Sequence, residues 1–329
     1  MSGSTAAFTH QACIYGSDEQ FLAMAMPFLE EGLDLGDPVL AVTTPANLEL
    51  INTALGARGA DVDYAESAFF GRRPAQRVAA FHRYWKRHTD GAAGSRVRVL
   101  AEPVWAGRSS REIAAWTRME AALNVALATT AISMICPYDM RILLPTIVAN
   151  ARSTHPEQVD GSHASACPEY GDPADFARAC DASPLPDPPA SAAEVQFSGD
   201  LRGLRQFVAS RATAHGLTSD RAGMLVLAAA EVATYAKNQP PGNATVRMWE
   251  QPGAVVCDFR LPRAANDGDP FLGLRPAELE PEPGDGLWLA GQICDWIEIR
   301  SDDDSSTIRL HVASRHNEEM AQPGIRYPI

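Results

Sequence analysis

A glycine turn at Gly284-Asp285-Gly286 precedes an apolar helical segment that begins at Leu287. Glycines at the start of a helix let backbone N–H groups surround a phosphate, and the positive end of the helix dipole favours the anion. Earlier in the chain, a second predicted helix contains Glu231, a carboxylate of the type that acts as a general base. By itself, the turn before a helix is only weak evidence for a phosphate site. The alternatives are a plain turn before a helix and a solvated helix carboxylate.

The residue one helical turn after Glu231 is Tyr235, which is a poor ligand for magnesium. Residues four apart share a helix face, so Tyr235 lies on the same face of the predicted helix as Glu231. Mg²⁺ demands compact oxygen ligands in octahedral geometry, and a phenol is too long and too weakly basic. We therefore expect this helix face not to hold Mg²⁺. No cofactor is firmly indicated, and ATP with Mg²⁺ is the candidate.

A second group of polar and aromatic residues lies in the first half of the chain. Tyr15, Thr43, Glu102 and Asp139 stand at or just after the ends of short apolar runs, where parallel α/β sheets place their ligands. We predict one shared pocket for a small molecule, although His10 as a turn residue and Asp139 as a helix N-cap are alternatives. The expected ligand-binding residues are His10, Tyr15, Glu102, Trp105, Glu120, Asn124, Cys136, Tyr138 and Asp139.

The six cysteines show no CxxC spacing, which favours free thiols in a reducing compartment. Metal-ligand residue types come close together along the chain only at His155, His163, Cys167 and Cys180. Their irregular spacing in a Pro- and Asp-rich segment is more typical of solvated side chains, so we predict no metal site. Cys136, between Ile and Pro at a strand end, is more typical of buried packing than of a nucleophile.

Length and charge narrow the class of protein. A chain of 329 residues exceeds the usual size of a single core, so two domains are expected. The net charge of -13, with no cluster of Lys and Arg, argues against nucleic-acid binding. No stretch reaches the roughly 20 apolar residues of a spanning helix, and residues 1–10 lack the features of a signal peptide. We therefore expect a cytoplasmic protein without a membrane span.

The first half alternates short apolar runs with helical segments. Strands are expected at 12–15, 38–43, 62–65, 97–101 and 132–136. Helices are expected at 18–33, 45–55, 74–88 and 109–128, with another after Asp139. This alternation predicts an α/β domain with a parallel sheet covered on both faces.

The composition then shifts to Pro, Asp, Ser and Ala, which predicts an extended linker over 157–193. The expected domains are therefore 1–156 and 194–314, followed by a loose tail at 315–329. In the second domain, helices are expected at 201–215 and 218–237, with strands at 245–250, 255–260, 296–301 and 306–312. Helices on one face of an antiparallel or mixed sheet make this domain α+β.

The segments AEVATYA at 230–236 and GDGLWLA at 284–290 resemble the N box and the second glycine box of the GHKL nucleotide-binding fold. More narrowly, they resemble its anti-sigma-factor serine-kinase branch. The resemblance implies a Bergerat-type α+β sandwich with Glu231 as catalytic base. It implies a nucleotide site made of Gly284, Asp285, Gly286, Leu287, Ser306 and Thr307. Two parts of the family pattern are missing, since Tyr235 replaces the magnesium-binding Asn and no Asp-x-Gly follows residues 257–260.

The first half resembles the MEDS sensory domain (methanogen/methylotroph sensory) over residues 8–156. The resemblance rests on FTHQACIY at 8–15, GRRPA at 71–75, EPVW at 102–105, GR at 107–108, EAALN at 120–124, CPYD at 136–139 and THP at 154–156. It implies a RecA-like α/β fold and a ligand-sensing function, often next to a kinase-like domain. No G-x-x-x-x-G-K-[ST] motif occurs, so nucleotide hydrolysis is not expected in this half.

These resemblances imply a regulator of transcription that acts by partner switching. An unknown small ligand in the first domain would control a degenerate kinase-like domain that binds a sigma factor or an anti-anti-sigma (STAS-type) protein. An acidic chain suits a basic partner surface, and a homodimer is one arrangement that the sequence allows. One alternative is an active ATP-dependent serine kinase that phosphorylates an anti-anti-sigma factor. Another is a small-molecule enzyme that uses Glu102 or His10 as a base.

Overall fold

The computed structural model describes residues 8–89, 96–262, 269–276, 285–302 and 304–314. These residues form two compact units, which meet in the sequence between Cys180 and Asp181. None of the helices in the described part combines the length and the apolar character needed to cross a bilayer. Each unit is considered by itself below.

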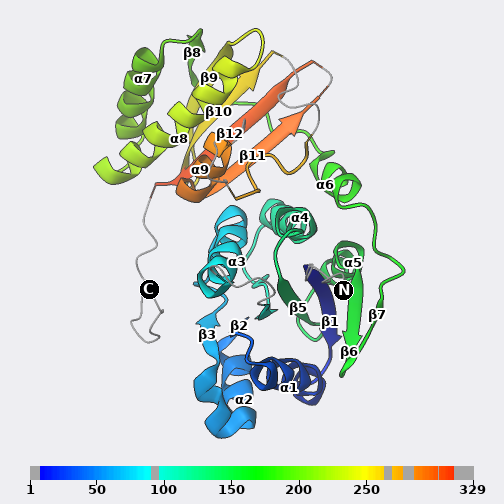
Figure 1. The fold of residues 1–329 in the computed structure, drawn as a ribbon. Helices are drawn as coiled ribbons and strands as arrows, with labels where there is room; N and C mark the ends of the chain where they lie inside the picture. Colours follow the sequence, from blue (N-terminus) through cyan, green and yellow to red (C-terminus); the bar gives the residue numbers. More distant parts are fainter. Residues whose placement is uncertain (1–7, 90–95, 263–268, 277–284, 303, 315–329) are drawn as a thin grey trace, which may run out of the picture. The chain divides into compact units, whose positions relative to one another are not determined.

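The amino-terminal unit is built on a seven-stranded sheet with the strand order β3-β2-β4-β5-β1-β6-β7 (Figure 1). All neighbouring strands are parallel except β6 and β7, which form an antiparallel hairpin. The strands are β1 (Thr9–Tyr15), β2 (Val39–Thr43), β3 (Asp63–Glu66), β4 (Val97–Ala101), β5 (Ile132–Asp139), β6 (Glu157–Asp160) and β7 (His163–Ala166). The predicted parallel sheet is therefore confirmed.

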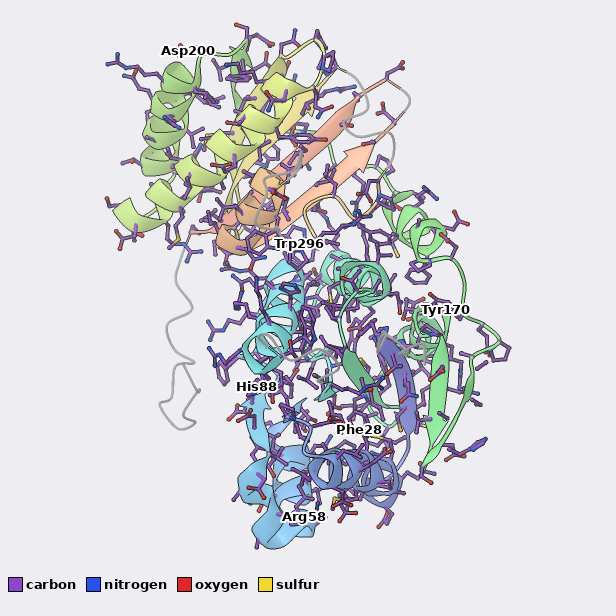
Figure 2. The ribbon with its side chains drawn as sticks, viewed as in Figure 1. Phe28, Arg58, His88, Tyr170, Asp200 and Trp296 are labelled. Atoms are coloured by element: carbon purple, nitrogen blue, oxygen red, sulfur yellow. The ribbon has the colours of Figure 1, made fainter. Side chains whose placement is uncertain are left out.

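Helices cover both faces of this sheet (Figure 1). The first face carries α1 (Asp18–Leu35) and α2 (Pro45–Leu55), and the second carries α3 (Pro74–Thr89), α4 (Ser110–Ala126) and α5 (Pro145–Thr154). A short 3-10 helix, η1 (Gly56–Asp61), follows α2. The side chains of the helices and the sheet fill the space between them (Figure 2). Two hydrophobic cores result, one on each side of the sheet.

The alternation of side chains along β1 assigns its residues to these two cores. His10 and Ala12 point to the side of α3, α4 and α5, whereas Cys13 and Tyr15 point to the side of α1 and α2. Its neighbour β5 is buried along its whole length, as expected for a central strand of a parallel sheet. This alternation decides which candidate site residues can meet.

Local signals in the sequence explain where the helices begin and end. The side chain of Ser17 caps α1 by accepting a hydrogen bond from the Gln20 N–H, and the helix ends at Gly36 in the left-handed conformation (φ 73°). A reciprocal capping box between Ser109 and Glu112 opens α4. These caps fix the starts of the two helices that lie on opposite faces of the sheet.

The segment predicted as an extended linker differs from that expectation. Residues 157–166 form the β6–β7 hairpin, and α6 (Pro173–Asp181) follows it. Strand β6 pairs with the edge of β1, and Gln11 Nε2 donates a 2.6 Å hydrogen bond to Glu157 Oε2. The prediction failed because the backbone of a polar segment can hydrogen-bond to an open sheet edge even when its side chains show no strand pattern.

The carboxy-terminal unit contains a five-stranded antiparallel sheet with the order β11-β12-β10-β9-β8. Its strands are β8 (Ala193–Phe197), β9 (Ala244–Gln251), β10 (Ala254–Leu261), β11 (Trp296–Ser301) and β12 (Ser306–Ala313). Helices α7 (Leu201–Ala214), α8 (Ser219–Asn238) and α9 (Asp285–Ile293) pack on one face around a single core (Figure 1). The predicted α+β arrangement of helices on an antiparallel sheet is confirmed.

Candidate functional site

The carboxyl ends of the central parallel strands border a crevice of 640 Å³ in the amino-terminal unit. Tyr15 ends β1, Thr43 ends β2, Asp139 ends β5 and Glu102 directly follows β4. Around Tyr15, Glu102 and Asp139, the crevice is completed by Asn47 and Arg141 and by the apolar side chains of Leu22, Leu50 and Ile142. A mostly apolar crevice with a few fixed polar groups is typical of a small-molecule site.

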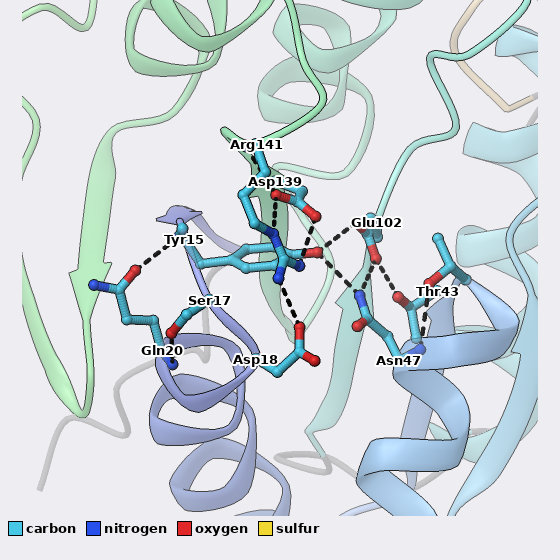
Figure 3. A network of polar contacts seen from close by, with 11 residues as sticks. Tyr15, Ser17, Asp18, Gln20, Thr43, Asn47, Glu102, Asp139 and Arg141 are labelled. Atoms are coloured by element: carbon cyan, nitrogen blue, oxygen red, sulfur yellow. Dashed lines mark hydrogen bonds and ion pairs between the residues drawn. The ribbon is translucent and has the colours of Figure 1, made fainter.

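Glu102 is held in place by three neutral side chains (Figure 3). Tyr15 donates a 3.0 Å hydrogen bond to Oε1, Asn47 Nδ2 donates a 2.8 Å bond to Oε2, and the Thr43 hydroxyl also donates to Oε2. Asn47 Nδ2 further contacts the Tyr15 hydroxyl at 3.0 Å, which closes the network. A carboxylate oxygen accepts more than one hydrogen bond, so Oε1 retains capacity for a donor group of a ligand.

The backbone of Glu102 is fixed as firmly as its side chain. Its carbonyl oxygen accepts hydrogen bonds from the Ser67 hydroxyl and, at 3.2 Å, from Arg77 Nη2. Arg77 is 1% exposed, lies against the rings of Phe81 and Trp116 among others, and has its pKa lowered to about 10 by burial. A buried cation therefore anchors the loop that carries the crevice carboxylate.

On the opposite side of the crevice, Arg141 makes a bidentate pair with Asp139 (Figure 3). The Nε–Oδ1 and Nη2–Oδ2 distances are both 2.8 Å, and Nη1 lies 2.9 Å from Asp18 Oδ1. The hydrogen bonds from Arg141 hold the pKa of Asp139 below its usual value. Asp139 is therefore a partner of Arg141 here, and the N-cap of α5 is Leu144.

The structure divides the nine predicted ligand-binding residues between two places. Tyr15, Glu102 and Asp139 line the crevice. The other six lie on the side of α3, α4 and α5, in or beside the second core: His10, Trp105, Glu120, Asn124, Cys136 and Tyr138. The single shared pocket was wrong because alternate residues of β1 and β5 point to opposite faces of the sheet.

His10, Glu120, Cys136 and His155 form a buried cluster, named here the histidine cluster. Their ligand-type atoms all lie within 4.8 Å of one another. Both histidine Nε2 atoms are 3.7 Å from Glu120 Oε2, and His10 Nε2 is 3.4 Å from Cys136 Sγ. The rings of the two histidines are 3.9 Å apart between centroids. Tyr138 packs edge-on against His155 and beside Trp105.

In the carboxy-terminal unit, the two strongest nucleotide candidates lie against each other. A Cβ added to Gly286, in the first turn of α9, would be 2.8 Å from Glu231 Oε2 of α8. Leu287 is buried in the core and Asp285 is the first residue of α9, whereas Gly284 lies outside the described residues. The glycine at 286 is thus explained by close packing of two helices.

Tyr235, one turn after Glu231, is part of the apolar core of this unit. Burial, together with the nearby Asp269, raises the pKa of its phenol to about 12, so the hydroxyl stays protonated near neutral pH. A buried, protonated phenol is unsuited to bind Mg²⁺.

Ser306 and Thr307 were both expected to close the nucleotide site, but they face opposite sides of β12. Ser306 is fully buried, and its hydroxyl lies 2.7 Å from that of Ser301. Thr307 lies on the face that carries the buried Asp258–Arg309 pair, away from the helices. The two hydroxyls therefore cannot serve one site.

A comparison with models of known families matches part of the chain. Residues 9–156 match the MEDS family. The model is described as the MEthanogen/methylotroph, DcmR Sensory domain. No curated protein matches the chain. The MEDS match covers β1 through α5 and includes both the crevice and the histidine cluster.

Sequence reasoning missed three residues of the MEDS-matching unit that contact its candidate groups. Asn47 and Arg141 complete the crevice, and Arg77 holds the Glu102 carbonyl. Asn47 lies in the first turn of α2, directly after the strand end at Thr43, and this position was an available signal. The contact of Arg77 with the crevice had no local signal, because the Glu102 carbonyl lies 25 residues further along the chain, after β4.

Proposed function

We propose that this chain is a ligand-responsive regulatory protein with a sensory unit and a partner-binding unit. The amino-terminal unit holds a small molecule in the crevice beside Glu102. The carboxy-terminal unit is a degenerate member of the GHKL serine-kinase branch. It binds a sigma factor or a STAS-type antagonist without transferring phosphate, so that ligand binding controls transcription by partner switching.

The observation that supports sensing most directly is the fixed carboxylate at the crevice. Glu102 is held by hydrogen bonds from Tyr15, Thr43 and Asn47 within the protein itself, and a preorganised site loses little entropy on binding. The match of this unit to a family described as sensory supports the same function. The arrangement favours a molecule with a hydrogen-bond donor for Glu102 and an apolar part for Leu22 and Ile142.

The carboxy-terminal proposal rests on the resemblance of residues 230–236 and 284–290 to two GHKL boxes. A five-stranded antiparallel sheet with helices on one face is compatible with that resemblance. Loss of phosphate transfer is supported by Tyr235, whose buried phenol stands where a magnesium ligand is needed. Without the metal, the charge of a triphosphate would lack its main counterion in an acidic protein.

Native mass spectrometry of the purified full chain tests the sensory unit. We expect the wild-type protein to retain a small molecule and Glu102→Gln to lose it. The carboxylate accepts hydrogen bonds at both of its oxygens, whereas one of the two terminal groups of glutamine is an NH₂ that can only donate, so the amide cannot accept from all three neighbours. Glu19→Gln, on the exposed surface of α1, removes the same charge and should retain the molecule. Equal retention by Glu102→Gln would exclude Glu102 from the site.

Isothermal titration of the full chain with Mg-ATP tests the carboxy-terminal unit. We expect no magnesium-dependent increase in affinity, and no phosphate transfer to a STAS-type protein. Phosphate transfer would instead establish the alternative, an active serine kinase. Glu231→Gln would then be the control, since it removes the proposed base while keeping the shape of the side chain.

A further inference from the structure

The histidine cluster draws its four side chains from four separate elements. His10 comes from β1, Glu120 from α4, Cys136 from β5, and His155 caps the carboxyl end of α5. All four are nearly or completely buried. Burying ionisable groups together is unfavourable unless they are paired or coordinate a metal. The cluster therefore requires a physical explanation.

Hydrogen bonds at the outer nitrogen of each histidine set its tautomer. His155 Nδ1 lies 2.7 Å from the Ala151 carbonyl oxygen, which only accepts, so Nδ1 carries the proton. His10 Nδ1 lies 3.1 Å from Asn124 Oδ1. The orientation of that amide follows from Asn124 Nδ2, which donates to the Thr154 carbonyl at 2.8 Å. In both rings Nε2 is consequently left with a lone pair directed into the cluster.

This arrangement is the usual one for histidines that bind a metal. Metal-ligating histidines almost always donate their other ring N–H to a carbonyl, carboxylate or similar acceptor, which fixes the ring and the tautomer. Both rings are buried, and burial disfavours the charged imidazolium, so neutral rings are expected here. Neutral imidazole is the form that ligates metals.

Three of the six distances inside the cluster are close to the edges of a coordination tetrahedron, and the other three are within 4.8 Å. Bonds of about 2.0–2.1 Å to nitrogen or oxygen and about 2.3 Å to sulfur place tetrahedral ligand atoms roughly 3.3 to 3.6 Å apart. The observed Nε2–Oε2 distances are 3.7 Å, and the Nε2–Sγ distance is 3.4 Å. Side-chain adjustments would place the four ligand atoms around one metal ion.

Among the residues that the structure describes, two of the inward-facing atoms, Glu120 Oε2 and His155 Nε2, have no hydrogen-bond partner. Facing acceptors repel each other unless a proton or a cation lies between them. A thiolate and a carboxylate together neutralise a divalent ion, so the loaded cluster would bury no net charge of its own. Arg77 is the nearby cation that favours the charged form of Glu120.

We propose that His10, Glu120, Cys136 and His155 bind a divalent transition metal of the Zn²⁺ type inside the amino-terminal unit. Two imidazoles, one thiolate and one carboxylate in a tetrahedral set suit zinc, and the mixture excludes the hard ions Mg²⁺ and Ca²⁺. The site is distinct from the crevice, because it lies on the other face of the sheet. The proposal differs from the expectation from sequence, which included no metal site.

Four ligands from the protein close such a site, which is typical of a structural metal. The ion would tie β1, β5, α4 and α5 together. His163, Cys167 and Cys180, which the sequence had grouped with His155, contribute no ligand atom to it. Binding would release the thiol proton of Cys136, whose pKa burial holds well above its usual value in the metal-free cluster.

The test loads the metal during synthesis, since the four side chains are nearly or completely buried. The full chain is produced in minimal medium supplemented with Zn²⁺, or with Co²⁺ in its place, and its metal content is measured by mass spectrometry. We expect one ion per chain and, for the cobalt form, a thiolate-to-metal charge-transfer band. The X-ray absorption spectrum of the zinc form should show one sulfur at about 2.3 Å and nitrogen or oxygen at about 2.0–2.1 Å.

Cysteine variants locate the site. Cys136→Ala should lose the charge-transfer band, whereas Cys13→Ala should keep it, because Cys13 is equally buried but points to the opposite face of the sheet. Folded wild-type protein that carries no metal from either medium would overturn the proposal, and a shared proton would then explain the cluster. A band that persists in Cys136→Ala, or a zinc shell without sulfur in the wild-type chain, would overturn it as well.

Discussion

Gly71 shows how a single residue without a side chain supports the crevice. Its φ is +59°, and an added Cβ would lie 2.4 Å from Arg77 Cα. Arg77 in turn donates to the carbonyl oxygens of Phe70 and Glu102. The glycine lets the chain pass close to α3, and the arginine then fixes the residue that lines the crevice.

Gly71→Ala should lower the free energy of unfolding by roughly 2 to 5 kcal/mol, which combines left-handed backbone strain with overpacking against a backbone. Gly107→Ala is the control, since Gly107 also has a positive φ (+77°) but an added Cβ would meet nothing within 4 Å. It should lose only about 1 to 2 kcal/mol from strain. Urea unfolding measures both, and equal losses would show that contact with Arg77 is unimportant.

At the residue scale, the predicted ends of the parallel strands indicated which polar side chains would line the crevice. Tyr15, Glu102 and Asp139 were found because each stands at or after a parallel strand, where the topology gathers polar groups. His10 and Cys136 were assigned to the same pocket, although strand alternation sends them to the other face. His10 is oriented by a hydrogen-bond acceptor on a helix far away in the sequence. The arrangement of the cluster around the proposed metal ion could therefore not be predicted.

Among the elements, the packing of α8 on α9 gives the glycine turn a structural explanation. Beyond the 2.8 Å approach to Glu231 Oε2, a Cβ at Gly286 would lie 3.3 Å from Glu231 Cβ. Close approach of two helices and binding of a phosphate both require small residues. Sequence alone could not distinguish these two uses of glycine.

Gly286→Ala should therefore destabilise the carboxy-terminal unit by about 1 kcal/mol or more, because α9 must move away from α8. Gly223→Ala on the exposed face of α8 is the matched control, since an added Cβ there would meet no atom within 4 Å. It should stabilise the unit by about 0.5–1 kcal/mol. Thermal unfolding followed by circular dichroism measures both, and a neutral Gly286→Ala would refute the packing explanation.

The regular elements were predicted well where hydrophobic periodicity was strong. The five first-half strands and four of its helices were expected close to their observed positions, because each buries a continuous or periodic apolar face. The β6–β7 hairpin was missed, since HASA at 163–166 is exposed throughout and gives no periodic signal. The pairing of β7 with β6 is made by backbone hydrogen bonds, which leave no pattern in the sequence.

For the whole molecule, the separate cores predict two folding units. Each of the three hydrophobic clusters takes all of its members from one side of the boundary between Cys180 and Asp181. Fragments 1–180 and 181–329 should each unfold cooperatively in urea. Fragment 1–156, which ends where the sequence first suggested a boundary, should be less stable than 1–180 because it exposes the edge of β1. Equal stability of the two would make the hairpin dispensable.

Arg77 gives the amino-terminal unit a property that neither of its candidate sites has alone. The same guanidinium donates to the Glu102 carbonyl and is attracted by the Glu120 carboxylate. A change of charge at Glu120, on one side of the sheet, therefore changes the electrostatic energy of Arg77, which holds Glu102 on the other side. By thermodynamic reciprocity, if an ion bound beside Glu120 changes the affinity of the crevice for its ligand by some factor, the ligand must change the affinity of the cluster for the ion by the same factor. The metal-loaded chain should therefore bind a ligand in the crevice with a different affinity from the metal-free chain.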